Sequence, residues 1–190
     1  MSRSLLIGVL SASFALALLS GCDRAAKEQA QPAQDSVVQA GGVIDASHAG
    51  AMLPELVVRN AAGAELDLAI IEGPVLLNLW ATWCAPCVVE MPQLDALASE
   101  MEGEIRVVTV SQDLRGAEVV TPFFAGKGFV HLEPWLDPET ALSAQFSEAG
   151  QLPLTILFDA SGREVWRVAG GYEWDSSEAI AAVRAGIAAQ

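Results

Sequence analysis

Two cysteines, Cys84 and Cys87, stand three residues apart in segment 78–94, which reads NLWATWCAPCVVEMPQL. A Cys-x-x-C pair can serve as a structural disulfide, a metal clip or a redox couple that alternates between dithiol and disulfide. The third cysteine of the chain, Cys22, lies near the amino terminus. The residues around the pair are therefore needed to distinguish between these three kinds of chemistry.

The metal and structural interpretations are the weaker ones. Structural zinc usually takes four Cys or His ligands, and the chain adds only Cys22, His48 and His131 to the pair, without a ligand-like spacing. A disulfide that closes so short a loop removes little chain entropy, so it would stabilise the domain little. We predict a redox couple with no metal and no other cofactor. A Cu(I) metallochaperone stays an alternative, because thiolates favour Cu(I).

The position of the pair at the start of a predicted helix gives its order of attack. Cys84 lies at the helix entrance, where unpaired backbone N–H groups and the helix dipole stabilise a thiolate. A stabilised thiolate is both a nucleophile and a good leaving group. We expect Cys84 to attack the substrate and Cys87, one turn further in, to resolve the mixed disulfide. Trp83 and Pro86, beside the attacking cysteine, are candidate contacts for a protein substrate.

The elements that position the pair alternate between strands and helices. Residues 75–80 form an apolar run that predicts a buried strand, and apolar residues then recur at helical spacing up to Gly103. Further along, the patterns predict a strand at 105–110, a helix at 117–127, a strand or loop at 130–136, a short helix at 138–146, a strand at 154–158, a turn at 159–162, a return strand at 164–168 and a last helix to 189.

Two local signals complete this outline. The turn-rich residues 60–63 separate two short segments, at 56–58 and 65–68, and predict a β-hairpin near the start of the domain. Asp175 and Glu178 have the spacing of a capping box for the last helix. Strands and helices in this order indicate a sheet sandwiched between helices.

The order of the elements resembles the thioredoxin fold. Within that fold, the motif WATWCAPCVVEMP, the Leu152-Pro153-Leu154 step before a strand and the 159–162 turn resemble the TlpA and ResA group of membrane-tethered disulfide reductases, which includes the cytochrome c maturation thioredoxins. The resemblance covers roughly residues 53–186. It implies an α/β, thioredoxin-like fold: a central mixed sheet flanked by helices, with an N-terminal β-hairpin extension. The activity that it implies is thiol-disulfide exchange.

The resemblance also implies roles for residues distant from the pair. Thioredoxins carry a buried aspartate six residues before the first cysteine, where this chain has Asn78, which cannot titrate. Glu90, three residues after Cys87 and within about 60° of it around a helix, is the expected substitute as the proton acceptor. Pro153 is expected in the cis form. The backbone of Leu152 before it would then pair with the substrate chain.

The amino terminus has the features of an export signal. Arg3 precedes an apolar run at 5–19, which is too short to cross about 30 Å of hydrocarbon as a helix. The following Leu-Ser-Gly-Cys resembles the lipobox of bacterial lipoproteins, in which Cys22 would be acylated. We therefore expect a signal peptide at 1–21, a lipidated, disordered tether at 22–42 and the thioredoxin-like domain at 43–190. Asp23 resembles a retention signal for the periplasmic face of the inner membrane, which makes the outer membrane the less expected location.

Charge and motif narrow the partners. The chain has 10 basic and 24 acidic residues, a net charge of -14, which argues against nucleic acid as a ligand. The resemblance implies disulfide-bearing protein substrates, such as apocytochrome c or copper-site proteins, and a membrane electron donor of the DsbD or CcdA type. We expect a monomer. A peroxiredoxin would carry threonine three residues before its reactive cysteine, where this chain has Ala81.

Overall fold

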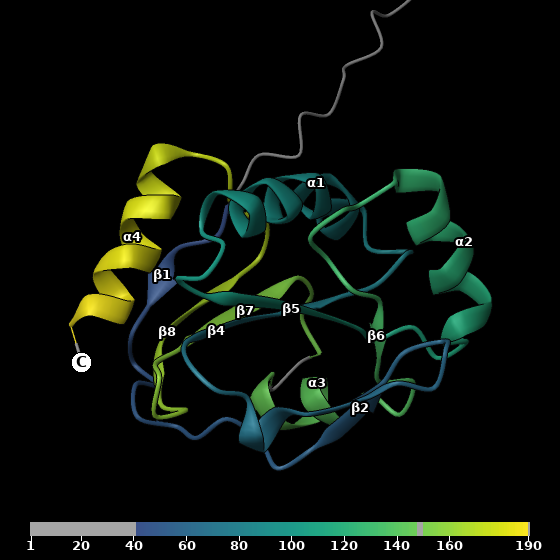
Figure 1. The fold of residues 1–190 in the computed structure, drawn as a ribbon, viewed down its shortest axis with the longest axis horizontal. Helices are drawn as coiled ribbons and strands as arrows, with labels where there is room; N and C mark the ends of the chain where they lie inside the picture. The colour runs from purple at the N-terminus through teal and green to yellow at the C-terminus, as the bar shows by residue number, and fades with distance from the viewer. Residues whose placement is uncertain (1–40, 148–149, 190) are drawn as a thin grey trace, which may run out of the picture. The chain divides into compact units, whose positions relative to one another are not determined.

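The computed structural model of the chain describes residues 41–147 and 150–189 (Figure 1). The predicted signal peptide, Cys22 and most of the predicted tether lie outside the described residues. The strands are β1 (Ile44–Asp45), β2 (Val57–Arg59), β3 (Glu65–Asp67), β4 (Val75–Trp80), β5 (Arg106–Ser111), β6 (Trp135–Leu136), β7 (Leu154–Phe158) and β8 (Glu164–Ala169). The helices are the 3-10 turn η1 (Leu68–Ile70) and α1 (Ala85–Glu100), α2 (Ala117–Lys127), α3 (Ala141–Phe146) and α4 (Ser177–Ala188).

The strands form one mixed sheet in the order β1-β8-β7-β4-β5-β6-β2-β3. β4 lies near its centre, where Leu77 pairs with Val108 of the parallel strand β5 and with Ile156 of the antiparallel strand β7. The hairpin predicted near the start of the domain forms as β2 and β3, which pair antiparallel. The predicted fold class, a mixed sheet flanked by helices with an N-terminal hairpin, is confirmed.

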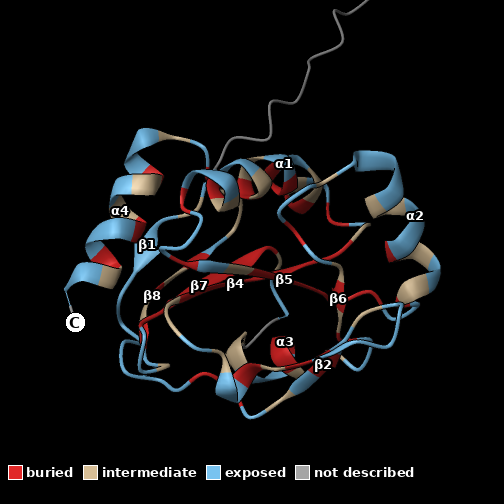
Figure 2. Ribbon diagram, in the orientation of Figure 1, coloured by how far each residue is buried: buried red, intermediate tan, exposed pale blue. Residues whose placement is uncertain are grey.

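Helices cover both faces of the sheet, and β4 contributes side chains to the core on each face. Its alternate residues Leu76 and Trp80 pack in a cluster with buried residues of α1, α2 and α4, whereas Leu77 and Leu79 pack with Leu142 of α3. Figure 1 shows α1 and α3 on opposite faces, and Figure 2 shows the buried strands between them. Because side chains alternate along a strand, the polar residue between Leu76 and Trp80 faces α1.

Helix α1 begins at the cysteine pair. Cys84 is its N-cap, and Pro86 stands in the first turn, where a missing N–H costs no intrahelical hydrogen bond. The buried face of the helix carries Cys87, Glu90, Met91, Leu94 and Leu97. One carboxylate therefore lies among apolar side chains that face the sheet.

Two of the predicted elements differ in detail. The segment 130–136, expected as a strand or a loop, contains only the two-residue strand β6. The predicted capping box of Asp175 and Glu178 is wrong, because Ser176 is the N-cap of α4 and its Oγ accepts the N–H of Ala179 over 3.1 Å. The cap is shifted by one residue because Ser176 itself can reach the third residue of the helix. In the part of the chain that the structure describes, no helix is both long and apolar enough to cross a membrane.

Candidate active site

Cys84 and Cys87 form a disulfide at the start of α1, with their Cα atoms 5.3 Å apart. The backbone N–H of Cys87 donates to the Sγ of Cys84 over 3.3 Å. Cys84 is 5% exposed, whereas Cys87 is fully buried. Cys84 is therefore the outer member of the pair, and it lies against the N–H groups of a helix terminus, which favour negative charge on its sulfur.

A buried carboxylate fixes the loop that leads to Cys84. Asp113, at the carboxyl end of β5, accepts the backbone N–H of Thr82 over 2.9 Å and its hydroxyl over 2.8 Å. The hydroxyl of Ser111 also donates to Asp113, over 2.8 Å. Three donors satisfy this carboxylate, so the loop between β4 and α1 is tied to the end of the neighbouring strand.

Glu90 is the only buried carboxylate on α1, at 2% exposed. Its Oε1 accepts the side-chain Nδ2–H of Asn78 over 2.8 Å. Its Oε2 accepts two further donors, the backbone N–H of Tyr172 over 3.3 Å and the indole N–H of Trp174 over 3.2 Å. The carboxyl group is thus held from the sheet on one side and from the segment after β8 on the other.

Burial raises the pKa of Glu90 from its usual 4.5 to about 7. Removal from water disfavours the charged form, and the hydrogen bonds from Asn78, Trp174 and Tyr172 oppose this effect only in part. No charged side chain is among the causes. A carboxyl group with such a pKa can both take and give a proton near neutral pH.

Asn78 occupies the position of the thioredoxin aspartate and faces Glu90. Its Nδ2–H group also donates to the hydroxyl of Thr155, over 2.9 Å, and the two residues are register partners on β4 and β7. Its Oδ1 is buried and has no hydrogen-bond partner among the described residues. The sheet therefore offers the carboxyl group an amide donor and no second acid.

Pro153 lies at the same end of the sheet as the cysteines. The Leu152–Pro153 peptide bond is cis, as the resemblance implies. Leu154 pairs with Leu79, so Pro153 stands beside the last residue of β4, from which the loop runs to Cys84. Leu152 is half-buried and packs against the cluster that contains both cysteines.

Exposed apolar side chains occur on the two loops that Asp113 joins. Trp83, directly before Cys84, is 68% exposed, and Leu114, the residue after Asp113, is 77% exposed. Pro86 stands in the first turn of α1 and lies close to Gly171, on which an added Cβ would be 3.6 Å from the Cβ of Pro86. The structure thus brings together Cys84, Cys87, Glu90, Trp83, Pro86, Leu152 and Pro153, while Cys22 lies outside the described residues.

Comparison with known proteins agrees with this geometry. A family model described as AhpC/TSA family matches residues 49–176. The chain belongs to the AhpC/TSA family. It is 30% identical over 122 residues to the thiol-disulfide oxidoreductase ResA of Bacillus cereus, a match that covers 64% of this chain and 69% of ResA.

Solved structures resemble this AhpC/TSA-family chain over most of their length. A protein from Chlorobium tepidum, assigned as the thiol:disulfide interchange protein DsbE, has a TM-score of 0.63 and 21% identity, with 73% of this chain and 96% of that one covered. A thio-disulfide isomerase from Thermus thermophilus has a TM-score of 0.60 and 27% identity, with 72% and 95% covered. The chain has the thioredoxin fold and is a thiol-disulfide oxidoreductase related to ResA.

Several residues that shape the site of this AhpC/TSA-family protein were not predicted from the sequence. Asp113 carries a weak signal, a carboxylate just after an apolar strand that ends near the pair. Tyr172 contributes a backbone N–H, which any residue except proline would supply. Trp174 is 84 residues from Glu90, so only the fold brings the two together.

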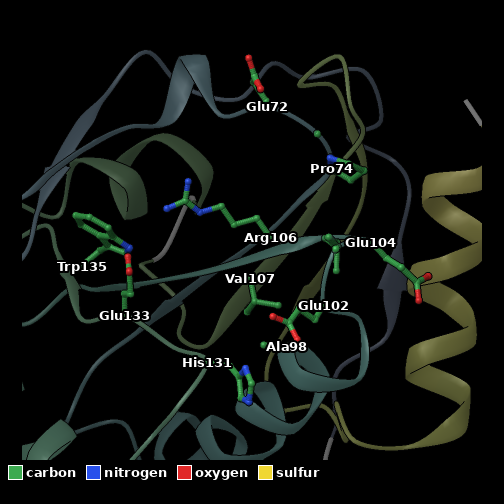
Figure 3. Close-up of a pocket in the computed structure, with 13 residues that line it drawn as sticks. Glu72, Pro74, Ala98, Glu102, Glu104, Arg106, Val107, His131, Glu133 and Trp135 are labelled. Atoms are coloured by element: carbon green, nitrogen blue, oxygen red, sulfur yellow. The ribbon is translucent and has the colours of Figure 1, made fainter.

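A pocket lies away from the cysteines (Figure 3). This pocket, of about 440 Å³, opens at the amino ends of β4 and β5, and its lining includes Arg106, Glu102 and Glu133. None of the predicted site residues lines it. Within residues 41–147 and 150–189, no three His, Cys, Asp or Glu side chains form a group that could hold a metal ion.

The pKa of Glu90 makes the stability of the oxidised protein depend on pH. A folded pKa of about 7 against 4.5 in the unfolded chain means that the folded state keeps a proton which the unfolded state loses. The contribution of Glu90 to stability therefore falls as pH rises from 4.5 to 7, by on the order of 3 kcal/mol, and is flat above. Urea unfolding of wild type and Glu90→Gln from pH 4 to 8.5 measures this loss.

The comparison isolates Glu90, because all other titrating groups are common to both proteins. The glutamine amide places an N–H group among the donors that Glu90 accepts, so the substitution has a free-energy cost of its own. That cost does not vary with pH, because the amide does not titrate. A difference between the two proteins that stayed constant from pH 4 to 8.5 would mean that Glu90 titrates normally.

Proposed function

We propose that this protein reduces disulfide bonds in other proteins, with Cys84 and Cys87 as its redox couple. The observation that carries the proposal is the layout of α1. Cys84 caps the helix at its outer end, Cys87 is buried one turn further in, and the buried carboxyl group of Glu90 follows on the same face. Relatedness to ResA supports thiol-disulfide exchange as the reaction.

The first half-reaction attaches the substrate to the enzyme. The reduced enzyme holds a Cys84 thiolate and a Cys87 thiol. The Cys84 sulfur attacks one sulfur of the substrate disulfide, so a bond between Cys84 and the substrate forms and the substrate S–S bond breaks. The released thiolate takes a proton from solvent. The helix terminus stabilises the attacking thiolate, and Trp83 and Pro86 beside it meet the substrate surface.

The second half-reaction releases the substrate. Cys87 gives its proton to the carboxylate of Glu90 and attacks the Cys84 sulfur, which forms the Cys84–Cys87 disulfide and frees the second substrate thiolate. That thiolate takes the proton that Glu90 received. Two electrons have then passed to the substrate, which is a dithiol, and the enzyme is in the oxidised form that the structure describes.

Substrate alignment is the part that we assign to Leu152 and Pro153. An extended segment of the substrate would lie along the backbone of Leu152, as in strand addition, with its disulfide over Cys84. The half-buried side chain of Leu152 packs on the cysteine cluster, which fixes the backbone that the substrate would meet.

Trapping tests the order of attack. In Cys87→Ser the first bond still forms but cannot be resolved, so we expect a stable mixed disulfide with Cys84. Cell extracts or membrane fractions treated with this variant should yield adducts on a non-reducing gel that dithiothreitol removes, and mass spectrometry would name the substrate. We expect apocytochrome c or a copper-site protein among them.

The matched control is Cys84→Ser, which should trap nothing and reduce no disulfides. Adducts that form through Cys87 in that variant would reverse the assigned order. Stoichiometric Cu(I) binding by the wild-type protein without any trapped adduct would instead favour a copper metallochaperone.

The direction of electron flow is the second test. Couples of this fold span about -120 mV for strong oxidants to about -270 mV for reductants, a gap of roughly 7 kcal/mol. The intervening Ala85-Pro86 step holds no cation that would stabilise the Cys84 thiolate further. We expect a potential near the reducing end, measured by equilibration with dithiothreitol or glutathione buffers. The matched variant Pro86→His should move it toward the oxidising end. A wild-type potential near -120 mV would make the protein an oxidase.

We further propose that the enzyme works as a monomer from the periplasmic face of the inner membrane, anchored through acylated Cys22. Residues 1–21 would be removed as a signal peptide and residues 22–42 would tether the domain 43–190, with a root-mean-square reach of about 25 Å. A membrane protein of the DsbD or CcdA type would supply the dithiol that returns the pair to its reduced form. The tether length suits this exchange with a membrane donor.

Cell fractionation checks the anchor. We expect the wild-type protein in the membrane fraction, extracted by detergent and not by salt, because several acyl chains bind a bilayer stably. Replacing residues 1–22 with a cleavable signal peptide that leaves no cysteine to acylate should move the protein to the soluble periplasmic fraction with its exchange activity intact. Membrane association that survives this change would overturn the lipid anchor.

A further inference from the structure

The segment 170–174 after β8 contacts three parts of the active site: Pro153, the first turn of α1 at Pro86, and Glu90. The N–H of Gly170 donates to the carbonyl oxygen of Pro153 over 2.9 Å, and Gly171 lies against Pro86. The N–H of Tyr172 and the indole of Trp174 both donate to Oε2 of Glu90. One short segment therefore spans from the cis-proline to the carboxyl group of α1.

Trp174 is held in place on every side. It is fully buried, its backbone N–H donates to Oε1 of Gln93 over 3.4 Å, and its ring stacks on Trp166 with an interplanar angle of 12°. Trp166 is in turn backed by α4, where Gly186 leaves room that a Cβ would fill, 3.0 Å from the Trp166 Nε1. The Tyr172 ring lies 4.9 Å from the Trp174 ring. The indole N–H thus has a fixed direction, toward Glu90.

We propose that Trp174 is a positioning residue of the exchange reaction, which holds Oε2 of Glu90 with its indole N–H, together with the backbone N–H of Tyr172, and so sets the pH range in which Glu90 accepts the proton of Cys87. The inference rests on the role given to Glu90 in the proposed function. It adds that the pH range in which Glu90 accepts a proton depends on a tryptophan that is 84 residues away in the sequence.

The physical reason lies in which form of Glu90 these donors favour. An N–H that donates to a carboxylate stabilises the charged form, so these bonds hold the pKa of Glu90 below the value that burial alone would give. The groups that donate to Glu90 are neutral: the Asn78 amide, which also donates to Thr155, the Trp174 indole and the backbone N–H of Tyr172. The cysteine pair earlier on α1 is also uncharged as a disulfide. In the reduced enzyme the two thiols are the other titrating groups at this site.

The contact can be read in the wild-type protein without any change in the core. The indole N–H resonance of Trp174 should shift with pH at the same midpoint as the Glu90 carboxyl carbon, about 7, because the two groups share a hydrogen bond. In Glu90→Gln this shift of the indole resonance should vanish. A Trp174 resonance that does not move with pH in the wild-type protein would overturn the inference.

Trp174→Phe removes the donor and keeps an aromatic ring. Loss of this donor should raise the pKa of Glu90 above about 7, so the ionised fraction at pH 7, and with it the exchange rate constant, should fall several-fold. At pH 9 both proteins carry an ionised Glu90, so the rates should converge. The measurement is the reduction of a fluorescent glutathione disulfide by the pre-reduced full chain, from pH 5.5 to 9.

Trp166→Phe is the matched control. It removes the same volume from the same stacked pair but no donor to Glu90, so its pH profile should keep the wild-type midpoint at whatever stability it retains. A uniform loss of rate at all pH values in Trp174→Phe, or the same profile in both variants, would assign Trp174 to packing alone and overturn the inference. Trapping by Cys87→Ser would still succeed in that case, so this failure is distinct from failure of the proposed function.

Discussion

A carboxyl group that is almost wholly removed from water needs hydrogen-bond donors from the protein. At the end of the sheet that carries the cysteines, the surrounding segments supply such donors to Glu90. Asn78 approaches from the central strand, while Tyr172 and Trp174 approach from the segment after β8. Those donors come from two places far apart in sequence. The helix that carries the cysteines is therefore fixed against the sheet by a carboxyl group that stands three residues after Cys87 on the same buried face.

The sheet topology explains why the remaining parts meet there. β4 and β5 run parallel, so their carboxyl ends share an edge, and β7 starts at that edge because it runs antiparallel to β4. The Cys84 loop follows β4, Asp113 follows β5 and Pro153 precedes β7. Three separate segments thus lie around one disulfide. The hydrogen bonds of Asp113 and the close packing of Gly171 against Pro86 fix their relative positions.

The site differs from the thioredoxin pattern in the place of its acid. An aspartate at position 78 would point from the sheet, whereas this chain has an amide there and carries the carboxyl group on α1. A group on the same helix as both cysteines keeps a fixed distance to them whatever substrate approaches. Its pKa depends on burial and on the donors that the 170–174 segment and Asn78 supply, so that segment contributes to the electrostatics of the site as well as to its packing.

The sequence alone predicted the fold class, because the order of its apolar patterns and turns follows that of the thioredoxin fold. From short motifs, and from the resemblance that these carry, it also predicted the order of attack at the cysteines and the candidates Trp83, Glu90, Leu152 and Pro153. It also placed every long strand and helix, which strong apolar patterns specify. It missed the cap of α4 by one residue, since two neighbouring polar residues compete for that position.

Only the tertiary structure decided which groups surround Glu90 and how far burial moves its pKa. Helical spacing puts Glu90 near Cys87, but desolvation depends on the sheet beneath it and on Trp174, which a linear pattern treats as one more core residue. A backbone N–H such as that of Tyr172 leaves no trace in a sequence. Contacts of this kind arise from long-range packing, so the sequence could point to Glu90 as a candidate but not to the groups that surround it.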